Sequence, residues 1–376
     1  MLMLQSLMNK IYAYNHPPIF FDFAQSIERF FVEEIPLFPF ANSGSNVILK
    51  IKKRDMSTFK LISVLANAAN IAQREIGYAG LKDKNATAIQ YISLPKVYEK
   101  ELLKNLTTDK IEILEKFYSK FPIKIGQLKA NRFSIVLHKV TPKVFEAIQN
   151  VTKEMLKEGI PNYFGYQRFG EDGKSFAQGQ KIAHTNKKLK GAKEKLLVSA
   201  YQSHLFNQWL ASRIALSHTL KANSPEKASK ILNYPKPLVE ALSQQPHFFK
   251  LFIGEHLQSY PQNKEYYCSD LQPCALEFAQ SKVSPTGLLA GSKTKRAVSD
   301  ARVLEAPFDD SELSSLYGDR RYAWIWVEDL AFEYRKEKEH LTIDFTLPKG
   351  AYATTFLEEI GKRELIDEKR TVSRLD

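Results

Sequence analysis

Two segments with sheet-type alternation lie far apart in the chain, and they constrain the fold more than any other feature. In residues 133–138, the side chains of Phe133, Ile135 and Leu137 share one face, and residues 341–348 (LTIDFTLP) return to a sheet pattern near the other end. Such alternation is typical of antiparallel strands that turn one face to a core. It predicts a sheet domain built from both ends of the chain and interrupted by an inserted domain.

Residue patterns before this point mix helices and strands. They predict strands over 46–53 and 88–94 and helices over 58–74, 96–119 and 142–158. Thr58 is expected to cap the helix over 58–74. Strands and helices that follow one another in this way are typical of an α+β fold with a mixed, mainly antiparallel sheet.

The composition changes from residue 181 onward. Residues 181–195 contain six lysines and one glutamate, and a long amphipathic helix is predicted over 196–217. The following hundred residues are rich in proline turns, and strand patterns return at 323–327. We therefore expect a discontinuous domain of residues 1–185 and 326–376, with an inserted domain of residues 186–325.

The charge of the chain favours an anionic partner. Of its 376 residues, 54 are Lys or Arg and 42 are Asp or Glu, which gives a net charge of +12, and 44% are hydrophobic. Nucleic acid, acidic lipid and nucleotide are the partner classes that such a folded basic protein favours. No segment approaches the ~18 apolar residues of a membrane span, and the start lacks a basic signal region. We expect a cytoplasmic protein without a membrane partner.

Motifs for nucleotides and metals are incomplete. Residues 165–170 have the glycine spacing of a phosphate-binding loop, but Glu171 stands where lysine is required, and GLLAGSK (287–293) is one residue short. None of the eight histidines lies in an HxxxH or HExxH pattern. We expect no nucleotide cofactor, no other cofactor and no metal.

The segment GYAGLKDKNA (77–86) is the first candidate for chemistry. It places Asp83 between Lys82 and Lys84 after a turn flanked by glycines. Neighbouring cations keep a carboxylate ionised, as a nucleophile or a base requires. An ordinary solvated Lys-Asp-Lys turn is the alternative.

The segment PNYFGYQRFG (161–170) is the second candidate. It combines four aromatic residues with an Asn, a Gln and an Arg, a composition that suits a nucleobase removed from its stack. The alternative is a buried aromatic turn. Lysines of residues 181–195 are similarly open to two interpretations, a phosphate-binding strip or a solvated face.

Together these segments resemble the TruD family of tRNA pseudouridine synthases. The similarity covers nearly the whole chain, in six blocks that occur in the family's order. The blocks are RFFVEEI (29–35), GYAGLKDKNA (77–86), GIPNYFGYQRFG (159–170), SAYQSHLFNQWLASR (199–213), PTGLLAG (285–291) and FTLPKGAYATTFLEEI (345–360).

The resemblance implies a pseudouridine-synthase fold with an inserted TRUD domain of α/β type. It also implies an isomerase that converts uridine 13 in the D arm of tRNA to pseudouridine without cofactor or metal, and that acts as a monomer. By position in the family motifs, Asp83 is the catalytic residue. The substrate-binding residues implied are Glu34, Lys82, Lys84, Gln90, Asn162, Phe164 and Arg168.

Some positions depart from the family pattern. Ala24 replaces a basic residue of the first motif, Ala88 a threonine beyond the catalytic Asp, and Glu358 an arginine of the last motif. The first departure leaves Lys82, Lys84 and Arg168 as alternative cationic partners of the catalytic carboxylate.

The chemistry and the class of function also leave alternatives. The carboxylate of Asp83 either attacks C1′ of the ribose or removes a ribose proton to give a glycal. A non-catalytic RNA-binding or RNA-folding protein on the same scaffold is the alternative function. A membrane-surface protein and a methyltransferase are less favoured, because the sequence has neither a clear basic amphipathic helix nor a cofactor loop.

Overall fold

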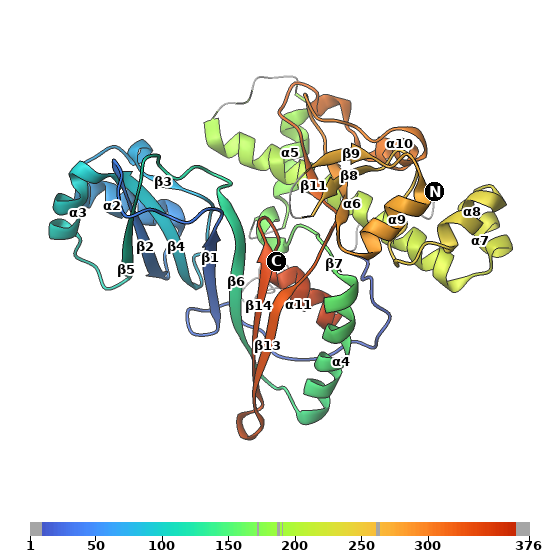
Figure 1. Cartoon of the computed structure of the whole chain (residues 1–376), viewed down its shortest axis with the longest axis horizontal. Helices are drawn as coiled ribbons and strands as arrows, with labels where there is room; N and C mark the ends of the chain where they lie inside the picture. Colours follow the sequence, from blue (N-terminus) through green and yellow to red (C-terminus); the bar gives the residue numbers. More distant parts are fainter. Residues whose placement is uncertain (1–9, 171–172, 186–188, 190, 261–263, 366–376) are drawn as a thin grey trace. The chain divides into compact units, whose positions relative to one another are not determined.

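The computed structural model describes residues 10–170, 173–185, 189, 191–260 and 264–365. It divides into two compact units, and each takes residues from segments that are distant in the sequence (Figure 1). Unit 1 consists of Met1–Pro18, Asn150–Trp326 and Ala351–Asp376, and unit 2 consists of Ile19–Gln149 and Val327–Gly350.

Unit 2 is built on a mixed, mainly antiparallel sheet, which confirms the predicted fold class. Its strand order is β13-β14-β6-β1-β4-β2-β5, and β3 pairs with β4. Strands β1 and β4 are parallel, whereas the other neighbours are antiparallel. The strands are β1 (Phe30–Pro36), β2 (Asn46–Arg54), β3 (Gly77–Tyr78), β4 (Thr87–Pro95), β5 (Ile111–Ser119), β6 (Leu128–Leu137), β13 (Glu328–Arg335) and β14 (His340–Pro348).

Two helices, α2 (Thr58–Ala69) and α3 (Glu99–Asn105), accompany the β2, β4 and β5 part of this sheet (Figure 1). Leu61 and Leu65 of α2 pack against apolar side chains of β2 and β4 in one buried cluster. The expected cap was wrong by one residue, because Ser57 accepts the hydrogen bond from the main-chain N–H of Lys60. The hydroxyl of Thr58 points instead to the candidate site described below.

The predicted helix over 96–119 was also wrong. Only its first half is helical, and Ile111–Ser119 forms strand β5 at the edge of the sheet. Charged side chains of β5 face lysines of β2, with Lys50–Glu115 and Lys52–Glu112 pairs at 3.3 and 3.5 Å. Such cross-strand pairs stabilise charged residues in a solvated edge strand. These charged residues hide the alternation of apolar and polar side chains that would have predicted a strand.

Unit 1 contains a four-stranded antiparallel sheet of order β11-β10-β8-β9 and a short β7–β12 pair. The strands are β7 (Ile160–Pro161), β8 (His256–Ser259), β9 (Glu265–Tyr267), β10 (Val283–Leu289), β11 (Asp319–Tyr322) and β12 (Trp324–Ile325). The helices are α5 (Ser175–Ala183), α6 (Gly191–Ala222), α7 (Pro225–Leu232), α8 (Lys236–Ser243), α9 (Leu271–Ala279), α10 (Ser299–Glu305) and α11 (Ala353–Gly361). Helix α4 (Pro142–Glu158) coincides with the predicted helix and crosses from one unit's residues to the other's.

The compact units have different bounds from the domains that the sequence predicts. A catalytic domain of residues 1–185 and 326–376 with an insertion of residues 186–325 stays a prediction. Within the described ranges, no helix combines the length and the apolar character that crossing a bilayer requires.

A buried ion pair fixes α6 inside unit 1. The guanidinium of Arg213 donates to both carboxylate oxygens of Glu255, at 3.0 and 2.8 Å, and to the carbonyl oxygen of Lys250. Both charged side chains are 1% exposed, and the guanidinium also lies against the rings of Trp209 and Phe249. Helix α6 carries residues that contact the candidate site, so this ion pair also holds those residues in place.

Removing one partner of this pair should destabilise the protein strongly. Arg213→Met leaves the buried Glu255 carboxylate uncompensated, and we expect the free energy of unfolding to fall by about 3–5 kcal/mol. Chemical denaturation measures it. The double variant Arg213→Met/Glu255→Gln should regain part of the loss, and Arg335→Met, which breaks an exposed pair with Glu333, should change little. A double variant no more stable than Arg213→Met would contradict the ion-pair explanation.

Candidate functional site

The block 77–86 forms strand β3 and then a loop. Gly77 is required where β3 passes close to the backbone at Ile123, because a Cβ atom at position 77 would lie 2.3 Å from the carbonyl oxygen of Ile123. Asp83 follows in the loop, where it is exposed. The local sequence therefore presents this carboxylate to solvent on a segment that is tied to the sheet.

A buried ammonium group holds the main chain at Asp83. Lys53 lies on β2 with 0% of its surface exposed, and its Nζ atom donates to the carbonyl oxygens of Met56 and Asp83, the latter at 2.9 Å. Burial lowers the pKa of Lys53 to about 8; the charge of Asp83 opposes this effect and that of Lys82 adds to it. The backbone beneath the exposed carboxylate thus depends on a cation that is shielded from water.

Lys82, which belongs to the loop itself, pairs with Glu34 of β1. Its Nζ atom lies 2.8 Å from Oε2 of Glu34, and the two side chains are only 5% and 1% exposed. Burial raises the pKa of Glu34 above its ordinary value, and the neighbouring ammonium opposes that rise. Each partner needs the other, because a lone charge in this position would be costly.

Thr58 and Gln90 connect this loop to α2 and β4. The main-chain N–H of Lys82 donates to the hydroxyl of Thr58 at 2.9 Å, and this hydroxyl donates to Oε1 of Gln90 at 3.1 Å. Both side chains are buried. Gln90 therefore belongs to the same cluster as Lys82 and Glu34.

Lys53 is a further cation at this loop, beside the three that the sequence left open. It bonds directly to the carbonyl oxygen of Asp83. Lys82, Lys84 and Arg168 stay the predicted alternatives for pairing with the carboxylate of Asp83.

The block 159–170 holds the ring of Phe164 in unit 1. The main chain of Phe164 makes two hydrogen bonds with the carboxamide of Asn207 on α6, at 2.8 and 3.0 Å. Its ring is partly exposed and meets the rings of Phe206 and Tyr352 in T-shaped contacts, with centroid distances of 5.6 and 6.1 Å. A fixed and partly open aromatic ring is suited to stack on a flat ligand.

Asn162 has a supporting position next to this ring. It is 3% exposed, its Nδ2 donates to the carbonyl oxygen of Tyr322 at 2.9 Å, and its Oδ1 accepts from Nη2 of Arg321 at 2.7 Å. Both ends of the carboxamide are therefore bonded within the protein.

Two guanidinium groups lie near Phe164. The central carbon of Arg321 is 3.9 Å from the ring centroid and that of Arg168 is 5.7 Å away, and Nε of Arg168 donates to the hydroxyl of Ser203 at 3.0 Å. Burial lowers the pKa of Arg321 to about 10, an effect that Tyr352 opposes and Arg168 increases. The guanidinium of Arg321 therefore still carries a positive charge at neutral pH.

The lysine strip is only partly described. Lys181 lies on α5, and Lys193 and Lys195 lie on α6, where all three are exposed. Lys187, Lys188 and Lys190 lie outside the described residues. Among the residues that are described, no group of three or more His, Cys, Asp or Glu side chains is placed to hold a metal ion.

The predicted site residues thus fall into two groups, one in each unit. Unit 2 brings together the residues of the Asp83 loop and its buried support, namely Glu34, Lys82, Asp83, Lys84 and Gln90. Unit 1 contains Asn162, Phe164 and Arg168.

The chain was compared with models of known protein families. A family model described as tRNA pseudouridine synthase D (TruD) matches residues 6–189 and 173–360 of the chain. This chain belongs to the tRNA pseudouridine synthase D family.

Relatives of this family are similar over almost their full length. A tRNA pseudouridine synthase D of Wolinella succinogenes is 44% identical over 360 residues, which is 95% of this chain and 99% of the relative. Those of a Nitratiruptor species and of Campylobacter jejuni are 43% and 37% identical, and each alignment spans 96% of this chain and 98% or more of the relative.

A solved structure of the TruD family has the same fold. It is a putative tRNA pseudouridine synthase D from Methanosarcina mazei, 20% identical, with a TM-score of 0.65 and coverage of 96% of this chain and 98% of its own.

The sequence motifs did not point to Lys53 or Arg321. The segment NVILKIKKR (46–54) suggests a strand that ends in solvent, yet alternation from Leu49 and Ile51 places Lys53 on the same buried face. That signal was available. Arg321 had no comparable local signal, because its hydrogen-bond partner Asn162 lies 159 positions earlier.

The low pKa of Lys53 predicts a pH-dependent contribution to stability. Between about pH 8 and its ordinary pKa of 10.5, this side chain holds a proton in the unfolded chain but not in the folded one. The free energy of unfolding of the wild type should therefore rise with pH across this window, relative to that of Lys53→Met. Urea unfolding from about pH 7 to pH 10 measures the difference.

The control for this experiment is Lys52→Met. Lys52 is the preceding residue of β2, is 26% exposed and lies 3.5 Å from Glu112. Its removal should not alter the pH dependence in the same window. Parallel wild-type and Lys53→Met curves would show that Lys53 is protonated in the folded protein throughout.

Proposed function

We propose that this chain converts uridine to pseudouridine in tRNA, at uridine 13 of the D arm, with Asp83 as the essential carboxylate. The observation that carries this proposal is the 44% identity to a relative named tRNA pseudouridine synthase D. The alignment covers 99% of that relative. Position 13 and the role of Asp83 come from the family resemblance of the motif blocks.

The reaction requires one carboxylate and a base that is held in place. The bond between C1′ and N1 breaks, the detached base turns, and C1′ bonds to C5 of the same base. C5 then loses its proton and N1 gains one, so no external reagent is consumed. Ionised Asp83 either attacks C1′ or accepts a ribose proton, and the exposed position of this residue suits both routes. Hydrogen bonding of its carbonyl oxygen to Lys53 supports the proposal, because a fixed backbone limits the orientations of the carboxylate.

Base binding is assigned to Phe164 and its neighbours. Stacking on the ring holds the uracil by its face, and Arg168 supplies a positive charge for the nucleotide. Asn162 keeps the chain beside the ring in position through its two hydrogen bonds. Glu34, Lys82 and Gln90 support the Asp83 loop, and the exposed Lys84 adds positive charge for RNA.

The wider binding surface is assigned by charge. The net charge of +12 and the exposed Lys181, Lys193 and Lys195 suit the phosphates of tRNA. With this function we also propose the domain division of residues 1–185 and 326–376 around a TRUD insertion of residues 186–325, and a monomer that works in the cytoplasm without a cofactor.

Asp83→Asn tests the proposal most directly. The variant should bind tRNA with affinity close to that of the wild type but form no pseudouridine, because the amide can neither attack C1′ nor accept the ribose proton. Site-resolved pseudouridine mapping of transcript tRNA measures the product. Asp109→Asn, which removes the same charge from an exposed turn of unit 2, should be fully active.

Three outcomes of this experiment separate the functions. Product from Asp83→Asn would refute the role of this carboxylate, and product at another uridine would refute position 13. Tight tRNA binding without any product from the wild type would favour the non-catalytic RNA-binding or RNA-folding protein.

Phe164→Ala tests the proposed stacking. Removal of a base-stacking ring costs about 1–3 kcal/mol, so kcat/KM for tRNA should fall by roughly 5- to 150-fold. Phe176→Ala is the matched control, because Phe176 stacks on His204, with a centroid distance of 3.9 Å, rather than on Phe164. Equal kinetics of the two variants would indicate that Phe164 has only a packing role.

A further inference from the structure

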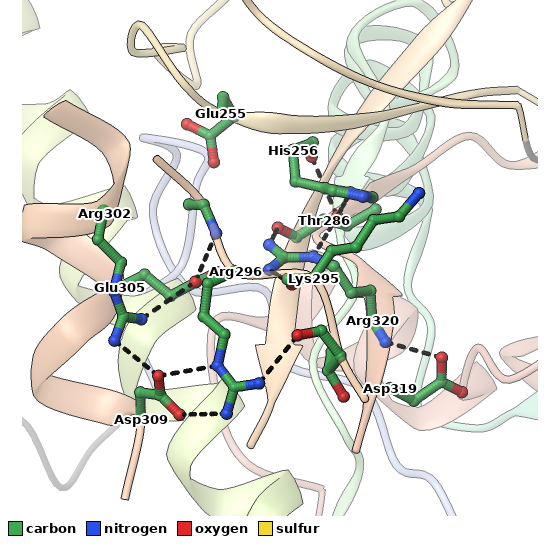
Figure 2. A network of polar contacts seen from close by, with 12 residues as sticks. Glu255, His256, Thr286, Lys295, Arg296, Arg302, Glu305, Asp309, Asp319 and Arg320 are labelled. Atoms are coloured by element: carbon green, nitrogen blue, oxygen red, sulfur yellow. Dashed lines mark hydrogen bonds and ion pairs between the residues drawn. The ribbon is translucent and has the colours of Figure 1, made fainter. Parts of the chain in front are cut away.

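Adjacent arginines of β11 leave the strand on opposite faces, as alternation requires. Arg320 enters the polar network in Figure 2, where its guanidinium lies 2.7 Å from the carboxylate of Glu305 and donates to the hydroxyl of Thr286 at 2.8 Å. Arg321 turns toward Asn162 and Phe164 instead. The two side chains have similar chemistry and burial but different surroundings.

The guanidinium of Arg321 bonds to the chain just before Phe164. Its Nε donates to the carbonyl oxygen of Asn162 at 3.0 Å, and its Nη2 donates to Oδ1 of Asn162 at 2.7 Å and to the carbonyl oxygen of Tyr163 at 3.3 Å. The same group lies 3.9 Å from the ring centroid of Phe164. One planar side chain therefore fixes both the backbone and the ring.

We infer that Arg321 is a positioning residue that sets the orientation of Phe164 for stacking on the target base. This inference rests on the proposed function. A guanidinium suits this task because its edge donates several hydrogen bonds while its face covers an aromatic ring. A lysine ammonium has the charge but neither the planar face nor the fixed fork of donors.

Aromatic side chains of α6 are also packed closely beside β10 and the ring of Phe164. Gly287 faces Arg321 across the β10–β11 ladder, and a Cβ atom there would lie 2.4 Å from the ring of Trp209 and 2.7 Å from that of Phe206. Aromatic side chains of α6 thus press on the strand beside Arg321, and Phe206 also contacts Phe164. The guanidinium and Phe206 together restrict the ring.

The test compares Arg321→Lys with Arg320→Lys in the full chain. Both variants lose hydrogen bonds within β11 and its neighbours, so both should lower the melting temperature. Only Arg321→Lys should slow the single-turnover rate at saturating enzyme, by about 10- to 100-fold, with little change in tRNA affinity. If the lysine variant does not fold, Arg321→Gln, which keeps a planar group with donors, replaces it.

A second readout does not depend on activity. The protein is labelled with 3-fluorophenylalanine, and the ¹⁹F resonance of Phe164 is assigned as the one lost in Phe164→Leu. Arg321→Lys should shift or broaden this resonance, whereas Arg320→Lys should leave it unchanged. This measurement reports on the ring itself and is made without tRNA.

The outcomes separate this inference from the proposed function. A wild type without product refutes the function, while the fluorine spectra still decide whether Arg321 orients the ring. Equal rates of the two lysine variants with an active wild type overturn the inference, and so does an unchanged Phe164 resonance in Arg321→Lys.

Discussion

An ammonium group shielded from water lies beneath the loop that presents Asp83. Lys53 donates to the carbonyl oxygens of Met56 and Asp83, and the second bond joins β2 to the loop at the exposed Asp83. Burying a charge is unfavourable unless it is well bonded, and the lowered pKa of Lys53 reflects this cost. The cost is tolerated because the bonds fix a backbone that has no regular secondary structure of its own.

A similar solution occurs in unit 1. The guanidinium of Arg321 is bonded to carbonyl oxygens before Phe164, and burial lowers its pKa while leaving it charged at neutral pH. In both units a cation on a strand holds an irregular segment that carries a candidate functional group. Strands are rigid, so a side chain anchored on one transmits that rigidity to a loop.

Regular elements of this fold were predictable where one face meets the core. The helix over 142–158 was predicted at its observed bounds, and the strand over 46–53 differs by one residue. The edge strand β5 was mistaken for helix because its lysine and glutamate partners hide its period of two. Motif blocks pointed to Asp83, Phe164 and Asn162, but they could not indicate what supports them, since Lys53 and Arg321 act from distant positions in the sequence.

The placement of these cations bears on how an isomerase without a cofactor would work. No external reagent enters the proposed reaction, so the protein contributes chiefly by holding a carboxylate, a ribose and a detached base in register. Exposed cations on flexible stems position a backbone poorly, whereas Lys53, Lys82 and Arg321 each have bonded partners in buried surroundings. The proposed function assigns phosphate binding to the exposed lysines, because this task needs charge more than fixed geometry. Under the proposed function, Lys53, Lys82 and Arg321 therefore position the backbone while the exposed lysines bind phosphates. Exchange between lysine and arginine should affect the buried group more than the exposed one.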